Sequence, residues 1–117
     1  MASGEDLTIA IAALSGRAQE VRRRYAAYET SLIGREWSTA ELMSGFVVDV
    51  GDLTRLVMAA TGARQVDDVT KKLEHELADC LWSVLVLAER LDVDLASAFD
   101  TTMTELTEFL DGQLPTP

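Results

Sequence analysis

The sequence lacks most features that mark secreted, membrane-spanning or disordered proteins. It has one cysteine, Cys80, so no disulfide can form within the chain. Its two prolines, Pro115 and Pro117, stand at the very end, and its seven glycines are scattered, which excludes collagen-like and linker sequences. The most apolar segment, residues 80–88, is much shorter than the roughly 20 residues of a membrane span. The N-terminus has no basic region of a signal peptide. We therefore expect a soluble, cytoplasmic protein.

Basic residues are also scarce. Ten lysines and arginines stand against twenty aspartates and glutamates, so the formal net charge is -10. Such a chain repels phosphate backbones and anionic headgroups, and we expect neither a nucleic acid nor a membrane as its partner. A phosphorylated small molecule remains compatible with this charge if a divalent cation accompanies it.

Helical periodicity is present along nearly all of the 117 residues. This length suits a single domain, which we place at residues 1–112, followed by a flexible tail at 113–117. Apolar residues recur every three or four positions, and no convincing run alternates with a period of two. The pattern predicts an all-α protein of the four-helix-bundle type. The predicted helices cover about residues 6–31, 39–61, 68–91 and 95–110.

Start and stop signals flank these predicted helices. Ser3 with Asp6, and Ser38 with Glu41, have the spacing of capping boxes. Aspartates stand where the third and fourth helices begin, and glycines follow the first, second and fourth helices. These further signals are Asp67 or Asp68, Asp94, Gly34, Gly62 and Gly112.

The apolar stripes predict how the helices pack. The stripe of the second helix runs from Leu42 to Val57 and should face the core. The third helix is apolar on more than one side between residues 81 and 88, so it should be buried on several sides. One monomer of four helices leaves such a helix under-covered. We therefore expect a homodimer or a dimer of dimers, with Leu85 at a subunit interface.

Two acidic pairs lie beside these apolar stripes. Asp49 and Asp52 are three residues apart on the second helix, and Glu76 and Asp79 repeat this spacing on the third. One interpretation is that they are surface carboxylates at the edges of amphipathic helices. The other is a shared site for a hard divalent metal, Mg²⁺ or Mn²⁺, because ionised carboxylates are costly to bury without a partner. The few cations nearby are Arg55, Lys71 and Lys72.

At these residues the sequence resembles the MazG-like proteins, a family of all-α nucleoside triphosphate pyrophosphohydrolases. Residues 49–53, Asp-Val-Gly-Asp-Leu, are similar to the family's E-x-G-E-L variant, with Asp at both acidic positions. Residues 76–82, Glu-Leu-Ala-Asp-Cys-Leu-Trp, are similar to its E-L-x-D-x-L-aromatic stretch. The resemblance covers about residues 37–106.

The resemblance implies a Mg²⁺-dependent enzyme, with Mn²⁺ as a possible substitute. It would cleave a nucleoside triphosphate between the α and β phosphates into a monophosphate and pyrophosphate. Its catalytic and metal-binding residues would be Asp49, Asp52, Glu76 and Asp79. The candidate substrate-binding residues are Lys72, Trp37 and Trp82. Trp82 can stack on a base or pack in the core, and Trp37 can staple its helix or cover a pocket.

Two departures from the family pattern favour an alternative. Aspartates in the first motif are one methylene shorter than glutamates, whereas Mg²⁺ demands tight octahedral geometry. Residues 100–106 contain no basic residue, whereas many members carry a lysine and an asparagine or arginine on the last helix for the triphosphate. The alternative is a non-catalytic protein of this fold that binds metal or nucleotide, or serves as an interaction module. A purely structural helical protein is a third class.

Other polar residues are expected to be structural. Arg22, Arg23 and Arg24 should form a solvated helix face, with a phosphate-facing role for one of them as the alternative. His75 is turned about 100° from Glu76 around the helix, so we expect a surface residue rather than a ligand. Cys80 should be a buried, inert thiol.

Overall fold

Four α-helices account for most of the chain. The computed structural model describes residues 2–62 and 68–115, and no strand occurs among them. The helices are α1 (Gly4–Ile33), α2 (Thr39–Ala60), α3 (Val69–Arg90) and α4 (Leu95–Gln113). The prediction of an all-α protein is confirmed. No helix in the described ranges has both the length and the apolar character that crossing a membrane requires.

The local signals set most helix ends. Both capping boxes are present, with the Ser3 hydroxyl accepting from the Asp6 amide at 3.1 Å and the Ser38 hydroxyl from the Glu41 amide at 3.2 Å. Gly34 ends α1 in the left-handed region at a φ of 77°, which glycine adopts without strain. Two predictions fail. α4 continues through Gly112, and Asp68 precedes α3 without a side-chain capping bond. Asp67 lies outside the described residues.

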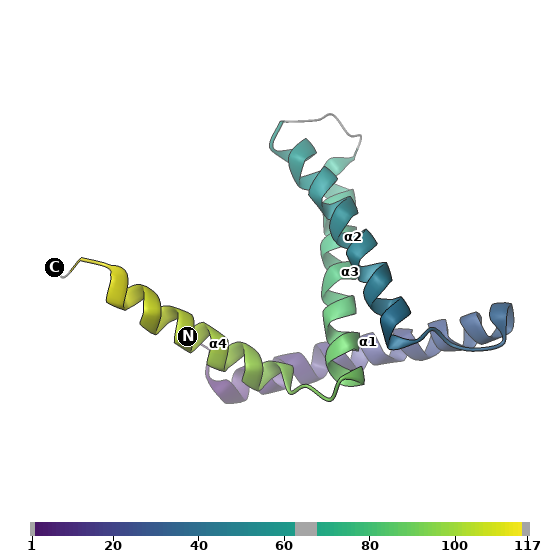
Figure 1. The fold of residues 1–117 in the computed structure, drawn as a ribbon, viewed down its shortest axis with the longest axis horizontal. Helices are drawn as coiled ribbons and strands as arrows, with labels where there is room; N and C mark the ends of the chain where they lie inside the picture. The colour runs from purple at the N-terminus through teal and green to yellow at the C-terminus, as the bar shows by residue number, and fades with distance from the viewer. Residues whose placement is uncertain (1, 63–67, 116–117) are drawn as a thin grey trace.

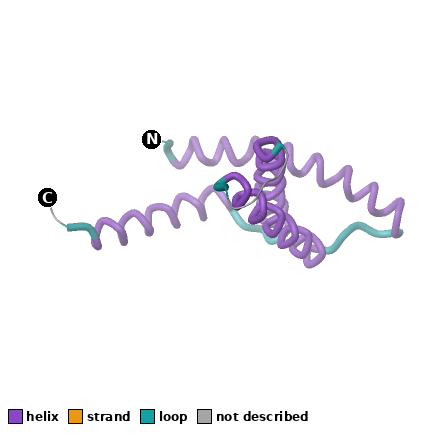
Figure 2. The backbone as a smooth tube through the Cα atoms, turned by 90° about the horizontal axis from the view of Figure 1, so that it is seen from above, coloured by secondary structure: helices purple, strands orange, loops and turns teal. Residues whose placement is uncertain are grey.

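The helices form an open arrangement rather than a closed bundle. α2 and α3 pack as an antiparallel pair that rises from α1, which crosses the end of the pair (Figure 1). α4 packs on the N-terminal part of α1 and then leads away to the C-terminus (Figure 1). The view turned by 90° shows the α2–α3 pair nearly end-on, between α4 and the far part of α1 (Figure 2). The molecule measures 62 × 39 × 22 Å.

The core lies where α1 crosses the pair. Its buried members are Ala18, Leu42, Leu85 and Val86. The indole of Trp82 donates to the Ala18 carbonyl at 3.1 Å, so this α3 residue packs on α1. Leu85 is only 4% exposed within the single chain. The prediction that Leu85 lies at a subunit interface is therefore wrong, because α1 already covers this part of α3.

Much of the predicted apolar surface is uncovered in the single chain. On α2 only Leu42 and Leu56 are buried, whereas Val50 and Val57 are exposed. α4 buries only Ala96 and exposes its stripe. The solvent-accessible surface of the chain is 8610 Å², whereas a compact protein of 12.8 kDa is expected to have about 6,300 Å². The excess is roughly 2,300 Å². The large apolar residues that α4 exposes are Phe99, Met103, Leu106, Phe109 and Leu110.

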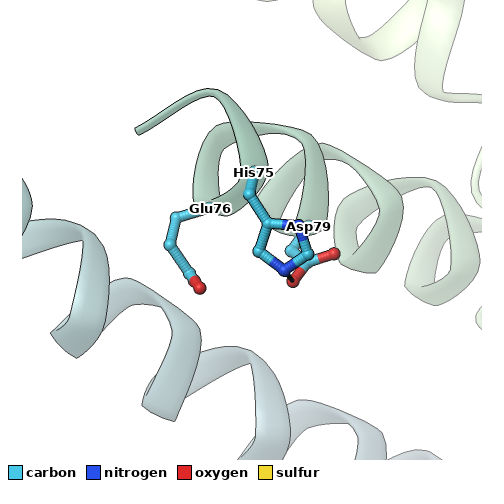
Figure 3. Close-up of side chains that lie close together, drawn as sticks. All are labelled: His75, Glu76 and Asp79. Atoms are coloured by element: carbon cyan, nitrogen blue, oxygen red, sulfur yellow. Dashed lines mark ion pairs between the residues drawn. The ribbon is translucent and has the colours of Figure 1, made fainter. Parts of the chain in front are cut away.

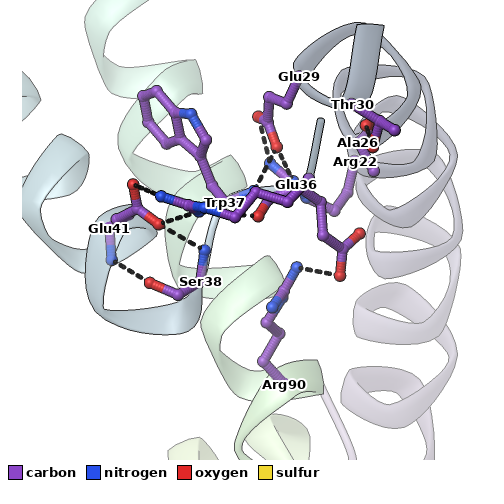
Figure 4. A network of polar contacts seen from close by, with 10 residues as sticks. Arg22, Ala26, Glu29, Thr30, Glu36, Trp37, Ser38, Glu41 and Arg90 are labelled. Atoms are coloured by element: carbon purple, nitrogen blue, oxygen red, sulfur yellow. Dashed lines mark hydrogen bonds and ion pairs between the residues drawn. The ribbon is translucent and has the colours of Figure 1, made fainter. Parts of the chain in front are cut away.

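Polar contacts join the segment between α1 and α2 to both α2 and α3 (Figure 4). Arg35 donates to Glu41 on α2 at 2.7 Å, and Arg90 on α3 donates to Glu36 at 3.4 Å. Arg35 and the Ser38 amide lower the pKa of Glu41 to about 2. The ionised Glu41 carboxylate therefore favours the folded chain above its ordinary pKa, and this contribution is lost as the pH falls from about 4.5 to about 2.

Arg35→Ala should lower the melting temperature near neutral pH by a small amount and have almost no effect near pH 2. The pair is exposed, so the decrease should be at most a few degrees. Thermal unfolding followed by circular dichroism at both pH values measures it. Arg23→Ala is the matched control, because Arg23 is exposed and forms no ion pair within the described ranges. An equal decrease at both pH values would contradict this account.

Candidate functional site

The antiparallel pairing of α2 and α3 brings the two acidic motifs together. The i, i+3 spacing places each acidic pair on one side of its helix, and both sides face the interhelical space. One oxygen from each of Asp49, Asp52 and Glu76 lies within 4.8 Å of the others. A second group joins Glu76 to His75 and Asp79, also within 4.8 Å (Figure 3). Glu76 is shared by both groups. The four carboxylates predicted as a metal site therefore form one cluster around Glu76.

Burial and mutual repulsion perturb this cluster. Burial raises the pKa of Glu76, and the charges of Asp49, Asp79 and Asp52 raise it further. Burial also raises the pKa of Asp49, followed by the charges of Asp79 and Asp52. One carboxylate oxygen of Glu76, Oε2, is buried without a hydrogen-bond partner. A buried acceptor without a partner is unfavourable, so this oxygen is a natural ligand for a cation.

Basic side chains of the protein reach only the edge of the cluster. Arg55 forms an ion pair with Asp52, and His75 Nε2 lies 3.1 Å from Asp79 Oδ2. The side chains of Arg55 and His75 are 58% and 71% exposed, so both pairs are on the surface. His75 is exposed, as predicted, yet its ring belongs to a possible ligand group. Glu76 itself receives no hydrogen bond from a cation in the described chain.

The residues present fit a hard divalent ion. Carboxylate oxygens suit Mg²⁺ and Mn²⁺, so the four carboxylates rather than the His75 imidazole are the natural ligands. Two oxygens bound to Mg²⁺ at about 2.1 Å lie at most about 4.2 Å apart. The separations of up to 4.8 Å within each group can close by small side-chain movements. The aspartates of the first motif are therefore long enough to take part.

A groove of about 800 Å³ opens on one side of the cluster. We call it the aromatic groove, because Tyr25, Tyr28, Trp37 and Trp82 line it. The Tyr25 and Trp82 rings lie 5.7 Å apart at an angle of 57°. Asp49 and Asp79 also line this groove, so carboxylates border an aromatic surface. Both tryptophans predicted to bind substrate thus reach the same groove. Trp82 also packs against the core, which is one of the two alternatives considered for it.

A second groove of about 630 Å³ lies on the other side of the cluster. We call it the basic groove, because Arg55, Lys71 and Lys72 line it. The carboxylates of Asp52, Asp68 and Glu76 line it as well, so the charge of this groove is mixed. Lys72 therefore lies beside the carboxylates but apart from the two tryptophans. The acidic cluster stands between an aromatic surface and a surface that carries three basic side chains among carboxylates.

A buried pair on α1 was not predicted from the sequence. Arg22 was expected to be solvated, but it is only 6% exposed and lines the aromatic groove. It donates to Glu29, which is 7% exposed (Figure 4). The signal was present in the sequence. Ala18, Arg22, Tyr25 and Glu29 are spaced by four, three and four residues, so they share one face of α1.

Cys80 is half-buried beside the carboxylates rather than fully enclosed. Burial raises the pKa of its thiol, and the nearby charge of Asp49 raises it further. A thiol with a raised pKa is a poor nucleophile, which agrees with the expectation of an inert residue.

Comparisons of the chain with protein-family models, with curated proteins and with solved structures found no match. Function must therefore be argued from the site. Its oxygen ligands can hold a divalent cation, its aromatic groove can accept a planar ring, and its basic groove can accept anionic groups. A nucleotide combines the last two features in one molecule.

Proposed function

We propose that this chain is a Mg²⁺-dependent nucleotide pyrophosphohydrolase of the MazG-like type, for which Mn²⁺ is an alternative ion. It hydrolyses a nucleoside triphosphate to a monophosphate and pyrophosphate. The observation that carries the proposal is the acidic cluster around the partnerless Oε2 of Glu76, set between the aromatic groove and the basic groove.

The two grooves suggest how such a substrate lies. The base stacks in the aromatic groove, where Trp37 and Trp82 offer aromatic faces. The phosphates pass the acidic cluster and reach the basic groove, where Lys72 and its cationic neighbours bind the terminal oxygens. Basic residues on α3 and α2 would thereby replace those that the last helix lacks.

The chemistry divides between the ion and the chain. Asp49, Asp52, Glu76 and Asp79 would hold the ion, and its charge would polarise the phosphoryl oxygens. The carboxylates position water for attack on the α phosphorus, and the bond to the bridging oxygen breaks as pyrophosphate departs. A carboxylate of the cluster accepts the proton that the attacking water loses.

We also propose that the active form is a homodimer or a tetramer. The excess exposed area of roughly 2,300 Å² equals the area that many obligate dimer interfaces bury. Apolar residues dominate the uncovered faces of α2, α3 and α4, including Leu77 and Leu81 beside the acidic motif. A second copy offers the same apolar faces, so the two copies can cover each other.

A non-catalytic protein that binds metal or nucleotide is the second candidate. The observation that favours it is the position of α4, which packs on α1, together with the absence of any basic residue on that helix. In that case the cluster and the grooves would bind ligand without turning it over.

Incubation with each common nucleoside triphosphate and Mg²⁺ or Mn²⁺ should release pyrophosphate and monophosphate in equal amounts. Coupled detection of pyrophosphate and chromatography of the nucleotide measure both products, and a chelator should stop the reaction. Release of orthophosphate instead would contradict cleavage between the α and β phosphates. Binding without turnover would favour the second candidate.

Substitution of Gly45 tests the base-binding role of the aromatic groove. Gly45 lines the groove, and a Cβ there would lie 3.7 Å from the Trp37 ring, an ordinary contact. Gly45→Ala should therefore be nearly neutral. Gly45→Leu should place a side chain in the groove where the base would bind. The base would then bury less apolar surface, so KM should rise at least about tenfold. Steady-state kinetics measure the difference, and equal KM values for both variants would place the base elsewhere.

A further inference from the structure

The most buried ion pair in the described chain lies next to the aromatic groove and not in the acidic cluster. Arg22 Nη1 donates to Glu29 Oε2 at 3.0 Å, and Arg22 Nη2 donates to Glu29 Oε1. Glu29 Oε1 also accepts the backbone amide of Trp37 at 2.8 Å. Figure 4 shows Glu29 next to Arg22 of the same helix and to the chain at Trp37 that leads into α2. One buried carboxylate thus joins two segments.

Removing two charges from water is costly, so a buried pair needs good geometry and further hydrogen bonds. Glu29 meets both conditions, since each of its oxygens accepts a donor, whereas Nε of Arg22 is buried without a hydrogen-bond partner. Burial on its own raises the pKa of Glu29, but hydrogen bonds from Arg22 and from the Trp37 amide outweigh it, and the net pKa is lowered. The carboxylate is therefore charged, and its bond to Trp37 is of the strong, charge-assisted kind.

The other ties of this segment are weaker. The side chains of Arg35 and Glu41 are 58% and 40% exposed, and the contact of Arg90 with Glu36 is long, at 3.4 Å, with the Glu36 side chain 54% exposed. Such pairs contribute little. Glu29 therefore provides the strong anchor for the backbone at Trp37, whose ring packs over Gly45 and lines the aromatic groove.

We propose that Glu29, held in place by Arg22, is a positioning residue that fixes Trp37 as a rigid wall of the aromatic groove. The pair thereby sets the affinity of the groove for a planar aromatic ring, because a wall that is already ordered loses less conformational entropy on binding. Arg22 and Glu29 do not touch the reacting phosphates in this arrangement. The consequence for nucleotide binding depends on the proposed function, whereas the positioning of Trp37 does not.

Paired substitutions separate positioning from simple stability. Arg22→Met combined with Glu29→Leu removes both buried charges and also the acceptor for the Trp37 amide. Replacing a buried ion pair by apolar side chains of similar volume is often tolerated. Arg22→Met combined with Glu29→Gln removes the charges but keeps an acceptor oxygen at position 29. The second pair should restore what the first pair loses.

The first readout is the accessibility of Trp37. In a Trp82→Phe background, Trp37 is the sole tryptophan. We call Arg22→Met with Glu29→Leu the leucine pair and Arg22→Met with Glu29→Gln the glutamine pair. Acrylamide should quench the fluorescence of Trp37 more strongly in the leucine pair than in the parent. The glutamine pair should return quenching toward the parent value. Arg35→Ala is the matched control for an exposed tie of the same segment and should leave quenching unchanged. Unchanged quenching in a folded leucine pair would overturn the proposal.

The second readout is kinetic and uses chains that retain Trp82. For a nucleotide that the wild type hydrolyses, the leucine pair should raise KM about tenfold, as expected for loss of one charge-assisted hydrogen bond, with kcat nearly unchanged. A fall in kcat with KM unchanged would overturn the proposal. If the wild type neither hydrolyses nor binds any nucleotide, the proposed function fails. The quenching result still decides whether Glu29 positions Trp37.

Amide hydrogen exchange in the wild-type protein covers the case in which the leucine pair does not fold. The Trp37 amide donates to a buried acceptor, so its exchange should be slowed well below that of an unstructured amide. Exchange at the unstructured rate under native conditions would overturn the proposal without any variant.

Discussion

Glu76→Gln is expected to abolish pyrophosphate release while the helices remain folded. Glu76 belongs to both possible ligand groups, and its Oε2 has no partner within the protein. Loss of this ligand charge should reduce kcat/KM by at least about 10³-fold, since metal-assisted charge stabilisation amounts to several kcal/mol. Steady-state kinetics with circular dichroism as a check of folding measures the effect. Asp52→Asn should behave in the same way.

The same substitution should raise the melting temperature in the absence of divalent ions. The pKa of Glu76 is raised in the folded chain by burial and by the neighbouring carboxylates, so its ionised form disfavours folding at neutral pH. This cost disappears as the pH falls below the raised pKa. Glutamine has almost the same volume and no charge, so it should remove the cost at neutral pH. A gain in stability together with a loss of activity is the mark of a functional site.

With divalent ions present, the wild type should have a higher melting temperature than Glu76→Gln. A ligand that binds only the folded chain stabilises it by about 2.7 kcal/mol at a hundredfold excess over Kd. Millimolar Mg²⁺ or Mn²⁺ should therefore raise the melting temperature of the wild type, and Glu76→Gln and Asp79→Asn should remove most of that gain. Glu74→Gln is the matched control, because Glu74 is exposed on the same helix and lies outside both groups. A wild type that is insensitive to metal would count against the site.

Leu106→Glu is expected to dissociate the assembly while each chain stays folded. Leu106 is 49% exposed in the single chain, so a charge there should cost the monomer little. If the stripe of α4 is buried between copies, the same charge becomes buried and unpaired, which is strongly unfavourable. Light scattering coupled to size-exclusion chromatography should show a dimer or tetramer for the wild type and smaller species for the variant.

Two further substitutions define the interface. Thr101→Glu places the same charge on the opposite side of α4 and should leave the assembly intact. Leu85→Glu should unfold the chain rather than dissociate it, because Leu85 lies in the core beneath α1. A wild type that is a stable monomer at micromolar concentration would reject the proposed assembly.

Local physical chemistry made the helices predictable. A capping box requires only four successive residues, so Ser38 and Glu41 marked the start of α2 without knowledge of any distant contact. The spacing of the acidic pairs was readable for the same reason, since three residues along a helix nearly complete one turn. The end of α4 was less predictable, because Gly112 is tolerated inside a helix when nothing else stops it.

Which apolar faces are covered was decided only by tertiary structure. The periodicity of α3 predicted that both Leu81 and Leu85 would be buried. It could not show that α1 covers Leu85 and leaves Leu81 exposed in the single chain. Periodicity reports the direction of a side chain around its own helix, whereas burial depends on where the other helices cross it.

The site shows the same division. The sequence by itself determined that Asp49, Asp52, Glu76 and Asp79 are paired on two helices, and a resemblance suggested their chemistry. Only the antiparallel contact of α2 with α3 decided that the pairs meet around one partnerless oxygen. The role of Arg22 also depended on tertiary structure. The sequence places Arg22 on the same face of α1 as Ala18 and Glu29, but only the crossing of the helices decides that this face is buried.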